Sequence, residues 1–237
     1  MKLQKLPRIA LAKLRPPNVF LTPEALAINK ARLEHLDSLR LDIEGRRVLE
    51  VGAGIGLHTP FFINKGCSVL STDGRASNVK EMKQKYPQRE IADLDLERID
   101  DISKIGVFDV IYCYGTLYHL STPAETLKAL SAISSMILVE TCCSIGEGEE
   151  DNIVDEVAKV ANQAKSGKGC RPTRRWVLAR LNEYWGHGYI SATQPDHPEF
   201  PQDWTPEAQA ANPELLTRAI FVGSKNPIDN PLLLDHI

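Results

Sequence analysis

Residues 48–56 read VLEVGAGIG, and this stretch decides the fold of the chain. Its first four residues are apolar except for Glu50, as in a parallel strand that is covered on both faces. Glycines follow at alternate positions, at Gly52, Gly54 and Gly56. Because glycine tolerates positive φ and has no Cβ, a ligand can lie against this backbone and face the free amides of the next helix. The stretch therefore predicts a strand, a turn and a helix around a nucleotide-type pocket.

Short apolar strands alternate with helices along most of the chain. This alternation predicts an α/β fold with a parallel sheet, right-handed crossovers and helices on both faces. We expect strands at residues 47–51, 68–72, 89–92, 108–113, 136–141, 188–193 and 217–224, and helices at 22–40, 57–65, 76–85, from 122 and at 173–185. We divide the chain into a basic arm at 1–22, a domain at 23–225 with insertions at 144–172 and 195–216, and a tail at 226–237.

The composition is that of an ordinary globular protein, with 43% hydrophobic and 25% charged residues among 237. No apolar run approaches the roughly 20 residues of a membrane span, and the proline-interrupted N-terminus does not read as a secretory signal. The net charge of −3 disfavours nucleic acid as a partner. The five cysteines form no C-x-x-C pair and the six histidines have no metal-ligand spacing. We therefore expect a cytoplasmic protein without a disulfide framework or a metal site.

An acidic residue, Asp73, ends the second predicted strand, and Gly74 follows it. A carboxylate at this point can accept two hydrogen bonds from a ribose diol, each worth about 1.5–3 kcal/mol. Enzymes that bind NAD use the same position, so Asp73 indicates a nucleoside without choosing its kind. An aspartate before a glycine is also a typical turn former.

The pattern E-x-G-x-G-x-G at residues 50–56 resembles motif I of the class I S-adenosylmethionine (SAM) dependent methyltransferases. A dinucleotide fingerprint, G-x-G-x-x-G, would instead require glycine where this chain has Leu57. The resemblance covers about residues 25–225 and implies a seven-stranded Rossmann-like sheet of order 3-2-1-4-5-7-6, with strand 7 antiparallel. It also implies SAM as the cofactor, bound by Glu50, Gly52, Ala53, Gly54, Gly56, Asp73 and Gly74.

Two further segments extend the implied cofactor site. After the third strand, the resemblance implies that Asp93 accepts the adenine amino group and that Leu94 lies beside the base. Asp93 also belongs to an acidic stretch that would suit a solvated loop. The sequence YGTLYHL at residues 114–120 resembles the G-x-L-Y-H-L segment of a subgroup that includes tRNA wobble-uridine modifying enzymes and many biosynthetic members. This second likeness implies that Tyr114 and Gly115 line the methionine side.

Two residues are candidate general bases. The resemblance implies that His119 faces the acceptor, where an imidazole can remove a proton; alternatively, it bonds a backbone carbonyl and fixes the loop. Glu140, at the tip of the strand at 136–141, is the second candidate base, and it too can instead bond nearby backbone.

The long insertions at 144–172 and 195–216 begin above the expected pocket, so we expect them to form a lid or an acceptor wall. The first insertion is either a solvated, charged face or holds an anionic acceptor through Arg171, Arg174 and Arg175. In the second insertion, the rings of Phe200 and Trp204 lie among polar groups and would suit a polyol or aromatic acceptor. Alternatively, the two rings hold a rigid surface loop against the domain.

The sequence as a whole predicts a SAM-dependent methyltransferase that methylates oxygen of a small molecule or sugar. Three alternatives stay open. They are a tRNA-modifying SAM-dependent transferase of the same fold, an NAD-dependent oxidoreductase, which Leu57 disfavours, and a SAM-binding partner subunit without catalysis. The identity of the acceptor and its methylated atom, the need for a divalent metal and the oligomeric state stay open as well.

Overall fold

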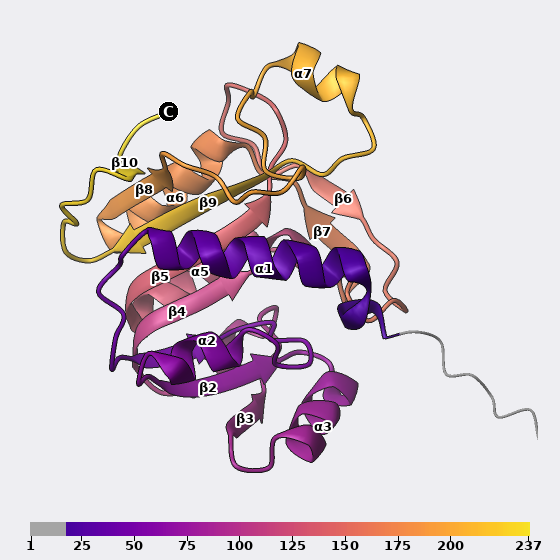
Figure 1. Cartoon of the computed structure of the whole chain (residues 1–237), viewed down its shortest axis with the longest axis vertical. Coiled ribbons are helices and arrows are strands. Elements are labelled where there is room, and N and C mark those ends of the chain that lie inside the picture. Colours follow the sequence, from indigo (N-terminus) through magenta and orange to yellow (C-terminus); the bar gives the residue numbers. More distant parts are fainter. Residues whose placement is uncertain (1–17) are drawn as a thin grey trace, which may run out of the picture.

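A computed structural model describes residues 18–237, so most of the basic arm predicted at 1–22 lies outside the described residues. Figure 1 shows one central sheet with α1 running across it. The strands are β1 (Arg47–Glu50), β2 (Ser68–Asp73), β3 (Glu90–Asp93), β4 (Phe108–Tyr114), β5 (Ser134–Cys142), β8 (His187–Ser191), β9 (Arg218–Ser224) and β10 (Leu233–Leu234).

The sheet order is β3-β2-β1-β4-β5-β9-β8-β10. Its first seven strands follow the predicted order, and β9 is antiparallel to both β5 and β8, as expected for strand 7. The eighth strand, β10, corrects the predicted count of seven strands, and it lies in the segment 226–237 that we assigned to a tail. A two-residue strand carries no periodic signal in the sequence, but Leu233 is buried and pairs with Ser191 of β8.

The helices cover both faces of the sheet, as predicted. They are α1 (Pro23–Ser38), α2 (Thr59–Asn64), α3 (Ala76–Lys85), α4 (Ile99–Ile102), α5 (Pro123–Ala132), α6 (Arg174–Trp185) and α7 (Pro206–Ala211), with short 3₁₀ helices η1 (Val19–Leu21) and η2 (Leu117–His119). The hydroxyl of Thr22 accepts a hydrogen bond from the backbone N–H of Ala25, which makes it the expected N-cap of α1. Among the helices of residues 18–237, none has the length and hydropathy that crossing a membrane requires.

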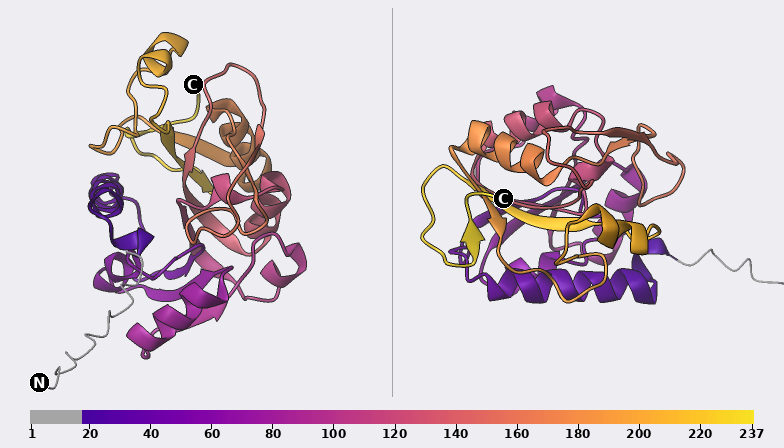
Figure 2. Two further views of the ribbon diagram at one scale, coloured as in Figure 1. Left: turned by 90° about the vertical axis from the view of Figure 1, so that its right-hand side faces the viewer. Right: turned by 90° about the horizontal axis from the view of Figure 1, so that it is seen from above.

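Two apolar layers hold the helices to the sheet. One packs Leu127 of α5 and Leu181 of α6 against Ile111 of β4. The other packs Leu36 of α1 and Phe62 of α2 against the opposite face. Figure 2 shows α1 and α6 on opposite sides of the sheet. All five cysteines are free and buried, where a thiol packs as a small apolar group.

The insertion at 144–172 forms a hairpin of β6 (Ile153–Asp155) and β7 (Lys168–Cys170), which is separate from the main sheet. It lies at the end of the sheet where α1 begins (Figure 1). The Arg75 guanidinium donates to the backbone carbonyls of Ala158 and Gln163, at 2.9 Å each. The insertion is therefore anchored beside the carboxyl end of β2.

Candidate functional site

A cavity of about 470 Å³ opens at the carboxyl ends of β1, β2 and β4. This volume lies in the roughly 300–1,000 Å³ range of small-molecule sites, and the position is where open α/β sheets bind ligands. Most of the predicted site residues line it: Glu50, Gly52, Ala53, Gly54, Asp73, Gly74, Leu94, Tyr114, Gly115 and His119. The predicted residues Gly56, Asp93 and Glu140 do not.

The glycine turn is held in a shape that side chains would not permit. Gly52 has φ +63°, and a Cβ there would lie 2.2 Å from the hydroxyl oxygen of Thr116. Gly54 has φ +57°, and a Cβ there would lie 2.8 Å from the ring of Phe20. The N–H of Gly54 donates to Asp73 Oδ2 at 2.9 Å. Since both glycines line the cavity, their bare backbone forms part of its wall.

Glu50 fixes this turn from below and is 2% exposed. Its Oε2 accepts hydrogen bonds from the hydroxyls of Thr59 at 2.6 Å and Ser71 at 2.7 Å. Burial raises the pKa of Glu50, against the effect of these two hydrogen bonds. The carboxyl therefore ties β1 to β2 and to the start of α2.

Asp73 lines the cavity, and both of its carboxylate oxygens accept hydrogen bonds. Its Oδ1 accepts from the backbone N–H of Arg75 at 2.8 Å and from Asn78 Nδ2 at 3.1 Å, while Oδ2 accepts from Gly54. Burial raises the pKa of Asp73, and these hydrogen bonds oppose that shift. The side chain is therefore fixed in place, and a carboxylate retains further acceptor capacity for a ligand.

In the segment around the end of β3, the acidic residue that lines the cavity is not the one that the sequence predicts. Leu94 lines the cavity as expected, but Asp93 is exposed and lines two other hollows instead. Asp95 lines the cavity instead, and its Oδ2 lies 2.6 Å from Lys165 Nζ of the insertion. Asp93 is the last residue of the edge strand β3, and its exposed side chain lies outside the cavity lining.

Three buried polar atoms without hydrogen-bond partners gather at the other end of the cavity. They are Arg32 Nε, His58 Nε2 and the hydroxyl of Tyr114. The Tyr112 hydroxyl lies 2.9 Å from His58 Nδ1, and a hydroxyl that donates there leaves the hydrogen on Nε2. Burial lowers the pKa of His58 to about 3, so this ring is neutral. Unpartnered buried donors cost free energy, which indicates that an acceptor group binds here.

Glu140 is placed between two arginines rather than at the cavity surface. It is 0% exposed, with Oε1 3.0 Å from Arg218 Nη1 and Oε2 2.7 Å from Arg32 Nη2. Burial acts to raise the pKa of Glu140, but the two guanidinium groups outweigh it and lower the pKa. Glu140 lies outside the cavity lining and is held by two guanidinium groups, so it is a poor general base. Its observed contacts fit the positioning of Arg32 and Arg218, which both line the cavity.

His119 lies on η2, is 16% exposed in its side chain and lines the cavity. Its Nδ1 is 2.5 Å from Glu156 Oε2, and its ring packs against that of Tyr118 with centroids 4.0 Å apart. The sequence offered a backbone carbonyl as the alternative partner for this histidine. The partner is instead a carboxylate from the insertion, immediately after β6.

The arginines of the first insertion and of α6 separate from one another. Arg171 lines the cavity, but Arg174 packs over the ring of Trp204 at 4.2 Å and Arg175 pairs with Glu147 at 3.0 Å. The predicted anion-binding trio is therefore not brought together. Among residues 18–237, no group of three or more His, Cys, Asp and Glu side chains is arranged to hold a metal ion.

Comparison with known proteins gives a partial match to a family. Residues 49–135 match a family model described as a methyltransferase domain. The ubiquinone biosynthesis O-methyltransferase of Xanthomonas oryzae pv. oryzae (strain PXO99A) is 29% identical over 110 residues, which cover 45% of this chain and 46% of that protein. The enzyme of the same name from Bordetella avium (strain 197N) is 29% identical over 119 residues, with the same coverage. The chain thus spans about half the length of these relatives.

Solved structures match over most of the chain. The N-terminal domain of EvdMO1, crystallised in the presence of SAH and D-fucose, has a TM-score of 0.63 at 20% identity, covering 86% of this chain and 85% of that one. The S-adenosylmethionine dependent methyltransferase from Mesorhizobium loti has a TM-score of 0.53 at 17% identity, covering 81% and 96%. These likenesses show a Rossmann-like methyltransferase fold and confirm the predicted fold class.

Proposed function

We propose that this chain, which has the fold of methyltransferases and a matching methyltransferase domain at residues 49–135, is a SAM-dependent methyltransferase acting on oxygen of a small molecule. One observation carries the proposal. The cavity presents the Asp73 carboxylate at one end and three unpartnered hydrogen-bond donors at the other, with the bare glycine turn between them. SAM has a ribose diol at one end and a carboxylate at the other.

The amino-acid end of SAM fits the donors at Arg32, His58 and Tyr114. All three line the cavity, and the guanidinium of Arg32 lies 3.5 Å from the position of a Cβ on Gly115. A carboxylate accepts about four hydrogen bonds, so it can accept from Arg32 Nε while Arg32 Nη2 stays paired with Glu140. We assign the methionine carboxylate to these three donors, beside the predicted residues Tyr114 and Gly115.

The acceptor end of the cavity is close to electrically neutral. Arg218 contacts both Glu140 and Glu199, and Arg171 contacts Glu156. Because these guanidinium groups already face carboxylates, they favour a neutral polar acceptor over an anionic one. We propose a hydroxyl of a small molecule or sugar. The O-methyltransferase names of the relatives support oxygen, and the presence of D-fucose with the EvdMO1 domain supports a sugar.

The protein's contribution to such a transfer is mainly alignment. SAM supplies an electrophilic methyl group, so the site has to hold the acceptor oxygen in line with it, which can be worth roughly 7–11 kcal/mol. The insertions at 144–172 and 195–216 place Gln163, Arg171 and His197 on the cavity wall, consistent with the predicted lid or acceptor wall. We retain the proposals that residues 23–225 form one domain and that the chain resembles the G-x-L-Y-H-L subgroup. We also retain the cytoplasm as the location, since free thiols persist in reducing compartments.

The first test is isothermal titration of the chain with SAM and with SAH. We expect both to bind, and we expect Asp73→Asn to weaken binding by about ten-fold, because one charge-assisted hydrogen bond to the ribose is worth about 1.5 kcal/mol. Methyl-labelled SAM incubated with a metabolite extract should then label a small molecule, which mass spectrometry identifies. If SAM and SAH do not bind the wild-type chain, the proposal fails.

A matched pair of variants locates the adenine. Asp95 lines the cavity, whereas Asp93 lies outside it, so we propose Asp95 as the acceptor for the adenine amino group. We expect Asp95→Asn to weaken SAH binding several-fold, by about 1 kcal/mol, and Asp93→Asn to leave it unchanged. The reverse pattern in calorimetric titration would restore the role that the sequence predicts for Asp93.

A further inference from the structure

The cavity residue His119 is oriented by a side chain that belongs to the insertion. Glu156 follows β6, and its carboxylate is 2% exposed. Oε2 lies 2.5 Å from His119 Nδ1 and accepts from the backbone N–H of Ala164 at 2.6 Å, while Oε1 lies 3.2 Å from Arg171 Nη1. Every one of these partners can donate a hydrogen bond, so the carboxylate fits here as an acceptor.

This arrangement fixes which ring nitrogen of His119 carries the hydrogen. An ionised carboxylate only accepts, so Nδ1 must donate to Glu156, and a neutral ring then has its lone pair on Nε2. Burial acts to raise the pKa of Glu156, but its hydrogen bond with His119 and its other donors outweigh it and lower the pKa. Since Nε2 is the ring nitrogen without a described hydrogen bond and His119 lines the cavity, that lone pair is available to a ligand.

We propose that Glu156 is the positioning residue for His119, and that His119 Nε2 is the general base for the acceptor hydroxyl. The inference rests on the proposed function and extends it to a specific proton path. As the acceptor oxygen gains the methyl group and the sulfonium becomes a neutral thioether, the hydroxyl proton passes to Nε2. Glu156 then faces an imidazolium, whose charge it balances until the proton leaves to solvent.

The insertion is therefore part of the reaction site as well as a cover. The segment from Glu156 to Arg171 carries the carboxylate and also lines the cavity through Ala161, Asn162, Gln163 and Lys165. Its anchor to Arg75 lies beside the nucleoside end, and its contact with His119 lies at the acceptor end. The base is correctly oriented only when this segment lies over the cavity.

Nitrogen NMR of the full chain with bound SAH tests the proposal without knowledge of the acceptor. The ring nitrogens of His119, assigned by comparison with His119→Asn, should report a protonated Nδ1 and an unprotonated Nε2 in the neutral ring. In Glu156→Gln, one of the two acceptor oxygens becomes an NH₂ group, so the strict preference for hydrogen on Nδ1 should be lost and a measurable share of the rings should carry it on Nε2. A wild-type ring with its hydrogen on Nε2 would overturn the proposal, whatever the variant does.

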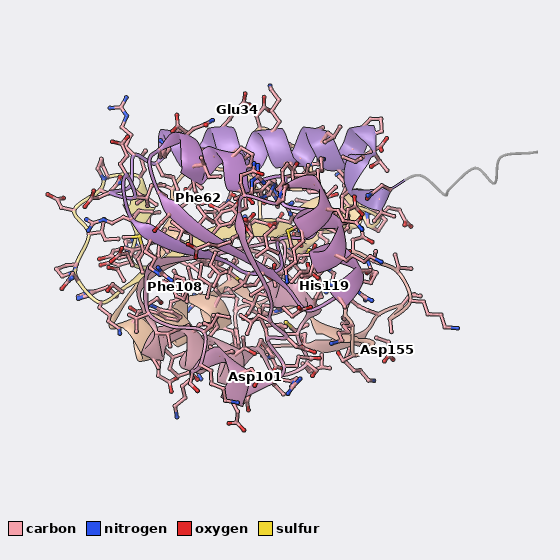
Figure 3. All side chains as sticks on the ribbon, turned by 90° about the horizontal axis from the view of Figure 1, so that it is seen from below. Glu34, Phe62, Asp101, Phe108, His119 and Asp155 are labelled. Carbon is pink, nitrogen blue, oxygen red and sulfur yellow. The ribbon has the colours of Figure 1, made fainter. Side chains whose placement is uncertain are left out.

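The kinetic arm separates positioning from binding. With methyl-labelled SAM and a small-molecule extract as the acceptor source, Glu156→Gln should lower the rate of label transfer about 10²–10⁴-fold at saturating SAM, with SAM affinity unchanged. The matched control is Asp155→Asn, since the neighbouring Asp155 carboxylate is 84% exposed and pairs with Lys168; Figure 3 labels Asp155 at the edge of the molecule and His119 further in. Wild-type turnover in Glu156→Gln would refute the inference alone, whereas loss of SAM binding by the wild type would refute the proposed function.

Discussion

Replacing Glu140 by glutamine lowers the free energy of unfolding by about 3–5 kcal/mol, because removing one partner of a buried ion pair leaves uncompensated charge. The Glu140 carboxylate forms ion pairs with two guanidinium groups, those of Arg32 and Arg218, whose side chains are 9% and 7% exposed. Urea denaturation at neutral pH measures the difference. The control is Glu183→Gln on α6, where Glu183 is 51% exposed and pairs with Arg180; its loss should cost less than about 1 kcal/mol.

The same variant has a defined pH dependence. The guanidinium groups hold the folded pKa of Glu140 below its ordinary value of about 4.5, against the effect of burial. The wild-type advantage is therefore fully present above about pH 4.5 and is lost as the pH falls through the lower folded pKa. Equal stability of the two proteins at pH 7 would contradict the paired arrangement.

Replacing His119 by asparagine should lower the rate of methyl transfer by about 10²–10⁴-fold, the usual worth of a positioned general base. Asparagine can still bond the Glu156 carboxylate, so the loop that carries it should keep its structure. The measurement is label transfer from SAM into a small-molecule extract, with calorimetric titration of SAM on the same preparation. We expect SAM affinity to stay at the wild-type value.

The matched control for this loss is His236→Asn. The His236 side chain is 81% exposed and contacts only Asp235 among its described polar neighbours, so its replacement should leave turnover unchanged. Full turnover in His119→Asn would assign His119 a purely structural part. A parallel loss in both variants would point to a general effect of removing imidazoles.

The sequence predicted the features that are local along the chain. The strand–turn–helix at 48–56 has a short-range signature, and Gly52 and Gly54 have the positive φ that the glycine pattern requires. Asp73 ends β2 as expected and bonds the turn. The order of seven strands followed from resemblance to a family with one sheet topology.

The features that the sequence did not predict depend on contacts between distant segments. Arg32 lies on α1, far from Glu140 in the sequence, and only the packing of α1 on the sheet brings it to Glu140 on β5. Glu156 belongs to a charged run that resembles a solvated face, and only the fold of the hairpin brings it to His119. The resemblance implies an adenine role for Asp93, but the residue of this acidic segment that lines the cavity is Asp95, which the spacing alone does not reveal.

The short strand β10 has a consequence for the handling of this chain. It pairs with β8, and Asn230 Nδ2 donates to the carbonyl of Leu39 at the end of α1, so the final segment is fastened at two points. Without it, the outer side of β8 would present unpaired amides and carbonyls, which invite strand addition from another molecule. We therefore expect that removal of residues 230–237 would expose this edge of the sheet and favour self-association.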